Sequence, residues 1–167
     1  MMNKTCNATL IPLTTSFGTI KSAIDSLTAD DETYLPSGLV WGLNALSEQA
    51  PLTEGKAYDT VGPNKDPRKV VVFMTDGVNT RSLSGSSHNG TNRTEADQTT
   101  AQLCSEIKSR KIEVFTVALM VPDLATQSML QACATDAVHF YDATNTSGLT
   151  IAFNQIAASL VQPYLSR

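Results

Sequence analysis

The segment KVVVFMTDGVNT, residues 69–80, carries the residue best placed to do chemistry. Five apolar residues, 70–74, run without a break into Thr75, Asp76 and Gly77. A short apolar run rich in valine predicts a strand buried on both faces. Ligands of parallel sheets bind just beyond the carboxyl ends of the strands, which is where Asp76 falls, and Gly77 allows a sharp turn there. An alternative stays open, in which Thr-Asp-Gly is an ordinary turn and Asp76 accepts backbone N–H bonds.

The other side chains able to do chemistry form no catalytic or metal motif. His88 lies in a loop rich in Ser, Gly and Asn, and His139, with apolar neighbours in a predicted strand, is expected to be a packed histidine. Neither has a Ser or Cys nucleophile with a recognisable signature nearby. The chain has three cysteines, Cys6, Cys104 and Cys133. They lack C-x-x-C spacing, which argues against zinc. A hydrolase acting at the strand ends around Asp76 is therefore only the alternative to a binding module.

From residue 70 onward, predicted strands and helices alternate along the chain. Strands are predicted at 70–74, 112–120 and 138–141, and helices from about 95, at 124–134 and after Ser147. This alternation predicts right-handed βαβ units. The expected fold class is therefore α/β, a Rossmann-like, doubly wound, mostly parallel sheet with helices on both faces.

Two helices are predicted before the first strand. Ser16 can cap a helix whose apolar residues, Phe17, Ile20, Ile24 and Leu27, lie three or four apart. Pro36 suits the first turn of a second helix with Leu39, Val40, Leu43 and Leu46 on its inner face, and Trp41 beside them is expected in the core. Residues 10–13 are an edge strand at best because they contain Pro12. Long loops are expected at 47–68 and 78–94, and loops of such length are usually functional or mobile.

Composition bounds the partners. The chain has 167 residues, a net charge of −4 and no basic cluster, so nucleic acid is not expected to bind. No apolar run approaches the length of a membrane span, and the chain alone is expected to be soluble. Its length suits one domain, 1–167.

Several motifs together resemble the von Willebrand factor type A domain. VVVFMTDGVNT resembles the fourth-strand motif, whose aspartate belongs to a metal-ion-dependent adhesion site, and TYLPSGLVWGL places Thr33 at the metal-site threonine. More narrowly, LPSGLVWGLNALSEQAPLTEG, LCSEIKSRKIEVFTVAL and MLQACATDAVHFYDATNTSGL are similar to TadG-like pilus-assembly proteins of bacteria. The likeness spans residues 6–161. It implies metal ligands at Thr33 and Asp76.

One motif of this family, D-x-S-x-S after the first strand, does not occur in the chain. The nearest spelling, Asp142-Ala-Thr-Asn-Thr146, follows the last predicted strand and is interpreted as a helix cap. The expectation is an incomplete domain without its first strand, first helix and second strand. Mg²⁺ prefers about six oxygen ligands, so Thr33 and Asp76 alone should bind it weakly or not at all.

The resemblance implies a non-enzymatic module of the bacterial cell envelope that helps to assemble or anchor Flp/Tad pili through protein partners. An extracytoplasmic location would preserve a disulfide. Cys104 and Cys133 are the expected pair because their helices flank the strand 112–120; two buried free thiols are the alternative. In the family the missing first strand pairs with residues 70–74. Without it this uncharged strand is an open edge, which predicts self-association.

Overall fold

The computed structural model describes residues 9–28, 32–58, 67–84 and 90–161. The elements in chain order are α1 (Phe17–Asp25), α2 (Leu35–Ala45), β1 (Val70–Thr75), α3 (Arg93–Ser109), β2 (Glu113–Leu119), α4 (Leu124–Cys133), the 3-10 helix η1 (Ala137–His139), β3 (Phe140–Ala143) and α5 (Thr146–Val161). The chain divides into two compact units. One contains residues 1–69 and 79–103, and the other contains residues 70–78 and 104–167.

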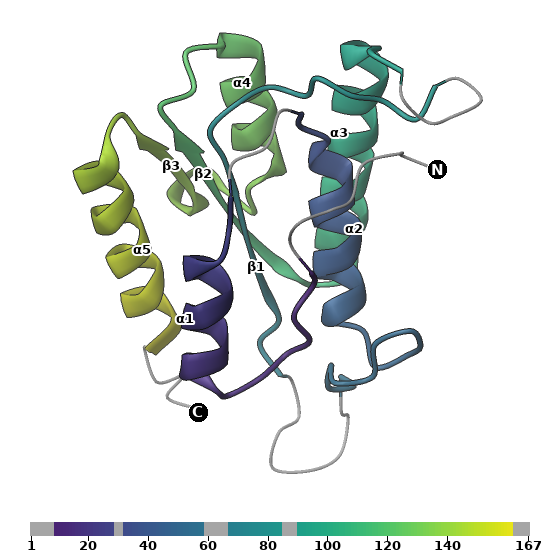
Figure 1. Ribbon diagram of the computed structural model, residues 1–167, viewed down its shortest axis with the longest axis vertical. Coiled ribbons are helices and arrows are strands. Elements are labelled where there is room, and N and C mark those ends of the chain that lie inside the picture. Colours follow the sequence, from purple (N-terminus) through teal and green to yellow (C-terminus); the bar gives the residue numbers. More distant parts are fainter. Residues whose placement is uncertain (1–8, 29–31, 59–66, 85–89, 162–167) are drawn as a thin grey trace. The chain divides into compact units, whose positions relative to one another are not determined.

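The second unit is built on a parallel sheet with the strand order β1-β2-β3 (Figure 1). Val70 of β1 is in register with Glu113 of β2, and Thr116 of β2 is in register with Phe140 of β3. The central strand is the most buried, because residues 114–118 are all shielded from solvent. The predicted Rossmann-like α/β fold with a parallel sheet is confirmed.

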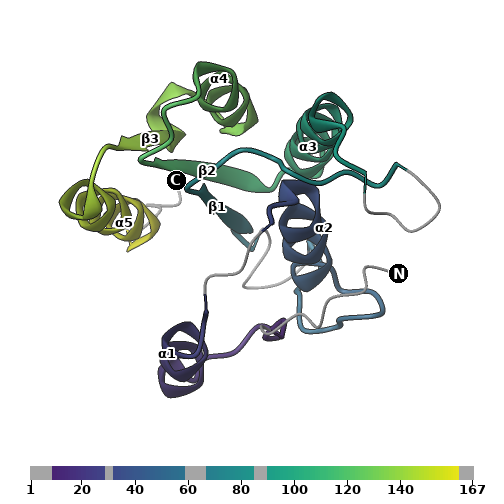
Figure 2. The same ribbon diagram turned by 45° about the horizontal axis from the view of Figure 1, so that its top comes forward.

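Helices α4 and α5 cover opposite faces of β2 (Figure 2). Phe115 and Val117 share a buried cluster with Ala152 and Ile156 of α5. Between them in sequence, Thr116 donates its hydroxyl proton to the carbonyl of Leu130 in α4, with the oxygens 2.9 Å apart. Successive residues of a strand point to opposite faces, so the two helices sandwich the strand.

Among the strands of the described residues, β1 pairs only with β2 and is therefore one of two outer strands, the other being β3. Phe73 and Thr75 on one face are buried. Val72 and Met74 on the other face are 39% and 45% exposed. They are in register with Phe115 and Val117, so they lie on the face that carries α5, and this helix leaves them open to solvent.

In the first unit, α1 begins as predicted, because the Ser16 side chain accepts a hydrogen bond from the backbone N–H of Thr19. Its apolar residues are not packed: α1 has no buried residue, and Phe17 is 84% exposed. A spacing of three or four residues makes a helix amphipathic without supplying a surface that covers it.

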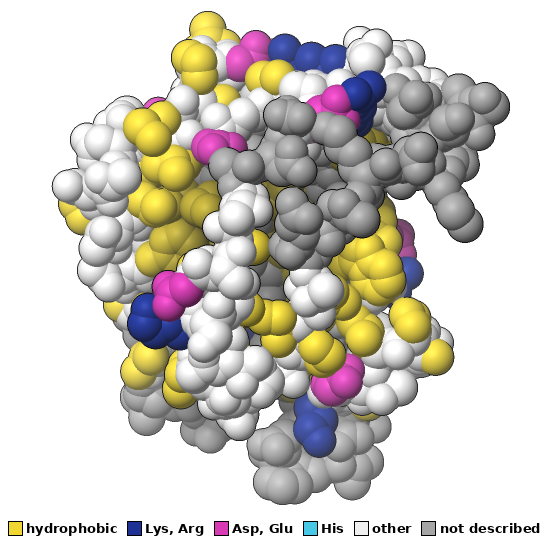
Figure 3. Space-filling model, viewed as in Figure 1, with side chains coloured by type: hydrophobic (Ala, Val, Ile, Leu, Met, Phe, Trp, Pro, Cys, Tyr) yellow, Lys and Arg dark blue, Asp and Glu magenta, His cyan; other side chains and the backbone are white. Residues whose placement is uncertain are grey.

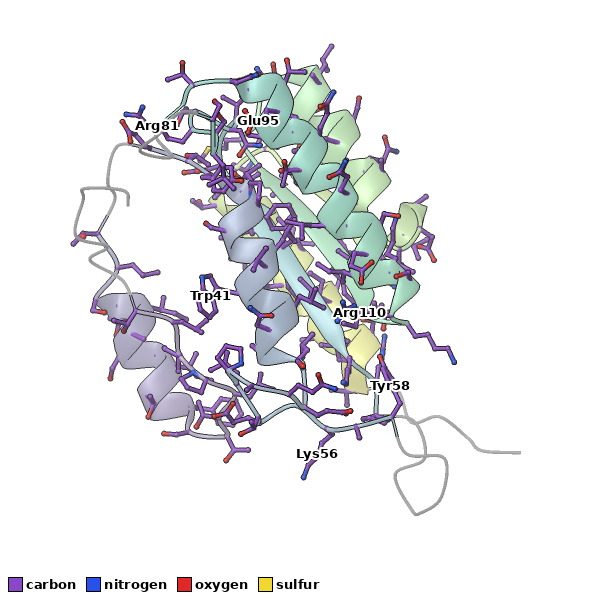
Figure 4. All side chains as sticks on the ribbon, turned by 90° about the vertical axis from the view of Figure 1, so that its right-hand side faces the viewer. Trp41, Lys56, Tyr58, Arg81, Glu95 and Arg110 are labelled. Carbon is purple, nitrogen blue, oxygen red and sulfur yellow. A yellow bond between two sulfur atoms is a disulfide. The ribbon has the colours of Figure 1, made fainter. Side chains whose placement is uncertain are left out.

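Helix α2 also starts as predicted, with Pro36 in its first turn and Leu39 buried. Two predicted core residues are not in the core, because Val40 and Trp41 are 39% and 46% exposed. Figure 4 shows Trp41 pointing outward from α2. Residues 10–13 form no strand.

Two loop regions and one boundary differ from or refine the prediction. Residues 47–58 and 67–69, in the first predicted loop, contain no helix or strand. In the second predicted loop, Ser82 and Gly90 form an isolated antiparallel bridge, and α3 starts at Arg93. The last strand was expected at 138–141, but β3 begins at Phe140 because Ala137–His139 forms a 3-10 turn. No helix in the described ranges is long and apolar enough to cross a membrane.

Candidate functional site

Asp76 follows β1 directly and is exposed. The hydrogen bonds of its turn are made by its neighbour: the Thr75 hydroxyl donates to the carbonyl of Gly77 at 3.0 Å and accepts from the N–H of Gly77 at 3.2 Å. Within the described residues no group donates a hydrogen bond to the Asp76 carboxylate. The interpretation of Asp76 as the bonding residue of an ordinary turn therefore does not describe this site.

Gly77 was expected to turn the chain through its conformational freedom. Its φ lies outside the left-handed range, and a Cβ atom placed on it would meet no atom within 4 Å. The turn is fixed by the hydroxyl of Thr75, and Gly77 leaves open space beside Asp76.

Thr33 belongs to the other unit, where its backbone is held on both sides. Its N–H donates to the Thr80 hydroxyl at 2.7 Å, and its carbonyl accepts from the N–H groups of Thr80 and Arg81 at 2.9 and 3.0 Å. Arg81 also forms an ion pair with Glu32. In contrast, the Thr33 hydroxyl makes no hydrogen bond to any described residue. Thr80 and Arg81 follow Asp76 in the chain by four and five residues.

Asn79 organises this region, and no local sequence pattern indicated it. Its side chain is buried and accepts the N–H of Leu35, the first residue of α2, at 2.7 Å. Its amide donates to Asp97 at 2.8 Å and to the Thr100 hydroxyl at 3.3 Å, both in α3. Figure 4 shows Arg81 and Glu95 at the same end of α2 and α3. Asn79 thus connects the loop that follows β1 to the N-terminal parts of α2 and α3. Thr33 lies two residues before the start of α2.

Thr33 and Asp76 offer oxygen ligands of the kind that a hard cation prefers, but too few of them. Together they supply one carboxylate and one hydroxyl, whereas Mg²⁺ takes about six oxygens in octahedral geometry. No group of three or more His, Cys, Asp or Glu residues in the described ranges could hold a metal ion. The residues present therefore do not fit a resident Mg²⁺ without further donors.

The interpretation of residues 142–146 as a helix cap rather than a metal loop can be refined. Asp142 lies within β3, in register with Ala118. The capping bond comes from Asn145, whose side-chain oxygen accepts the N–H of Gly148 at 2.8 Å in the first turn of α5. Asn145 bonds the residue three positions later because the N–H of Gly148, in the first turn, has no acceptor within the helix.

Cys104 in α3 and Cys133 at the end of α4 are joined by a disulfide in the second unit, with their α-carbons 5.1 Å apart. Both side chains are buried. Beside this bond, the Lys108 ammonium donates to the carbonyl oxygens of Ala132 and Ala134, which end α4. Cys6 and His88 lie outside the described residues.

His139 is not the simply packed histidine that was expected. Its Nδ1 lies 2.5 Å from the Asp136 carboxylate, its Nε2 lies 2.6 Å from Glu113, and the ring contacts Phe115 with the centroids 4.4 Å apart. Burial lowers the pKa of His139, but hydrogen bonds and charge from the two carboxylates outweigh burial, so the net pKa is raised. The hydrogen bond to His139 lowers the pKa of Asp136.

This cluster is remote from Asp76 along the sheet. Glu113 begins β2 opposite Val70, the first residue of β1, whereas Asp76 follows the last. At 3.3 Å per residue, six residues separate the two ends of β1 by roughly 20 Å. His139 therefore does not take part in a site at the strand carboxyl ends.

The fold is similar to several solved structures. The pilus adhesin SpaC from Lactobacillus rhamnosus GG is 15% identical over 87% of this chain, with a TM-score of 0.62. Proximal thread matrix protein 1 from the mussel byssus is 16% identical over 87%, with a TM-score of 0.54. A structure of that matrix protein with a zinc-occupied MIDAS motif is 19% identical over 86%, with a TM-score of 0.53.

These likenesses define the class of the fold, which is of the von Willebrand A type. At such low identity they show the fold alone. This chain spans 21% of the adhesin and 28–29% of the matrix protein. No protein-family model matches the sequence, and no curated protein matches it at a significant level.

Proposed function

We propose that this chain is a non-enzymatic binding and assembly module of an extracytoplasmic adhesive structure. One observation carries the proposal: the Asp76 carboxylate and the Thr33 hydroxyl have no partner among the described residues, although the backbone beside each is held by hydrogen bonds. Polar side chains on a hydrogen-bonded scaffold with unused oxygens are suited to bind an external group. Similarity to a pilus adhesin and a byssal matrix protein supports the same class of role.

The finer proposal follows the sequence resemblance. The module belongs to a TadG-like protein of the bacterial cell envelope, where it helps to assemble or anchor Flp/Tad pili through protein partners. Its ligand binding depends on a divalent cation held by Thr33, Asp76 and the oxygens of a D-x-S-x-S segment, which this chain does not contain. The zinc-occupied MIDAS motif of the matrix protein supports the choice of a metal site. Once such a site is complete, the cation could bind a carboxylate of the partner protein.

No feature of the described residues favours the hydrolase alternative. Both ring nitrogens of His139 are engaged by carboxylates rather than by a hydroxyl or thiol, so this histidine activates no nucleophile.

The test is cation binding with and without completion. A polypeptide that carries the D-x-S-x-S motif and its strand, fused upstream or added separately, should create Mg²⁺ binding that calorimetry detects, while the chain alone binds weakly. Asp76→Asn should abolish the binding because it removes the charge of the only carboxylate among the two ligands, and Thr33→Val should weaken it because it removes a hydroxyl ligand.

Asp142→Asn is the matched control. It removes another exposed carboxylate at the end of a strand in the same sheet and should leave binding unchanged. Tight binding by the chain alone, or no binding after completion, would refute the proposed site. In cells, Asp76→Asn should reduce adhesion at an unchanged protein level, and unchanged adhesion would argue against the adhesive role.

A further inference from the structure

The outer side of β1 is the longer of the two open edges of the sheet in the described part of the chain, since β3 at the other edge has four residues. Among the described strands, β1 is paired along one side only. Its six residues include no charge and no proline, and Val72 and Met74 are substantially exposed. Strand edges without such protection are templates for another strand. We propose that β1 pairs antiparallel with β1 of a second copy of this chain, forming a two-fold dimer with a continuous six-stranded sheet.

Two-fold symmetry limits the register of this pairing. The axis must run perpendicular to the sheet, so both copies present the α5 face on the same side. Directly opposed residues of antiparallel strands point to the same face. A residue whose side chain lies on the α5 face must therefore oppose a residue on the α5 face of the second copy. One permitted register places Val72 on the axis opposite Val72 of the second copy. Val70 then opposes Met74 and Val71 opposes Phe73, so every pair with both members in β1 is apolar, while Thr75 opposes Lys69 just outside the strand.

Charges that flank the strand select this register. With Val72 on the axis, Arg68 of each copy, two residues before β1, comes to the same end of the strand pair as Asp76 of the other copy, which directly follows β1, so the dimer gains two pairs of opposite charge. A register centred on Phe73 would set Asp76 against Val70, and one centred on Val71 would set Arg68 against Met74. Opposite charges placed across two strands are favourable and fix the register.

This arrangement does not require Arg68 to be unpaired in the single chain. A guanidinium has five N–H donors and can serve more than one acceptor. The Asp76 carboxylate has unused acceptor capacity, because no described residue donates to it. On the α5 face, the partly exposed Val72 and Met74 side chains gain apolar neighbours from the second copy. Figure 3 shows hydrophobic side chains already exposed along α5, the helix of that face.

A single strand pair is small compared with the roughly 1,000 Å² of a stable interface. The dimer should therefore be weak, with a Kd in roughly the micromolar range, and it should dissociate as salt screens the charge pairs. Sedimentation velocity of the full chain, in buffer without divalent cations, should show this concentration and salt dependence. The inference does not depend on the proposed metal site, since no metal is present in this measurement.

Variants separate this interface from unspecific association. Val72→Lys places two ammonium groups on the axis and should abolish the dimer, while Val138→Lys, at a side chain 74% exposed outside the strand, should leave it intact. Arg68→Glu or Asp76→Lys should each weaken the dimer by about tenfold, since each removes two favourable charge pairs. Combining both substitutions restores opposite charges and should restore the dimer. A monomer at every concentration, or a charge swap that fails to restore association in a folded protein, would overturn the proposal.

Cross-linking tests the register itself, in a Cys6→Ser background. Val72→Cys places the two Cβ atoms about 5 Å apart across the axis, so diamide should give a disulfide-linked dimer. Met74→Cys is the matched control, since the two residues 74 would be offset by four residues, roughly 13 Å along the strands. Equal cross-linking of both variants would refute this register.

Discussion

Asn79→Ala should be among the most destabilising single changes in the first unit. The side chain is buried, and truncation leaves the N–H of Leu35 without its acceptor. An unsatisfied buried donor costs about 1–3 kcal/mol, and a lost hydrogen bond to a charged group costs about 1.5–3 kcal/mol. Asp97 keeps Arg93 as a partner, and Thr100 still donates to Ala96, which reduces the loss. The free energy of unfolding should therefore fall by about 3 kcal/mol in urea denaturation.

Asn79→Asp tests the same network by charge. A carboxylate in place of the amide that donates to Asp97 at 2.8 Å would face a second carboxylate, and repulsion raises the pKa of one member of such a pair. The variant should be less stable than Asn79→Ala at pH 7 and should regain stability relative to it on acidification, as one carboxyl group protonates.

Asn154→Ala, an exposed position on α5, is the control and should change the unfolding free energy by less than about 0.5 kcal/mol. If Asn79→Ala also cost less than about 0.5 kcal/mol, Asn79 would not organise this region.

Two further predictions concern the second unit. His139→Gln should lower the melting temperature by a few degrees near pH 6. Because the pKa of His139 is raised in the folded state, its stabilisation is complete below the unfolded pKa of about 6.5 and is lost as pH rises through the folded pKa. A loss of melting temperature that grows with pH would contradict the stabilisation of protonated His139 by Asp136 and Glu113. Replacing Cys104 and Cys133 by Ala should cost about 3–4 kcal/mol, the loop-closure value for a separation of 29 residues; free thiols at both positions in non-reducing peptide maps of secreted protein would contradict the pairing.

The strands and helices of the second unit were predictable because their signals are local. An unbroken apolar run indicated β1, and α4 was expected at 124–134 and spans Leu124–Cys133. The start of β3 was misplaced because Asp136 caps the turn Ala137–His139, which an apolar pattern alone does not distinguish from a strand.

The predictions were wrong where an outcome depended on another part of the chain. The spacing of apolar residues in α2 predicted that Val40 and Trp41 lie in the core, but it could not show whether a surface lies against them. Asn79 was missed for the same reason, since its bond to Leu35 joins residues 44 positions apart. At the candidate site, the sequence indicated Asp76 and Thr33 but not that the Thr75 hydroxyl makes the turn and leaves the carboxylate unused.

Both the proposed cation site and the proposed dimer use Asp76 and the outer side of β1. Cation binding and dimerisation should therefore compete. The sequence resemblance implies that the strand before D-x-S-x-S lies beside residues 70–74, the same side that the second copy would occupy. A dication at Asp76 would likewise compete with Arg68 of the second copy for one carboxylate. Linkage is reciprocal: if cation binding weakens the dimer by some factor, dimerisation must weaken cation binding by the same factor. Self-pairing through β1 would thus oppose cation binding at Asp76 until a strand that lies beside residues 70–74 displaces the second copy.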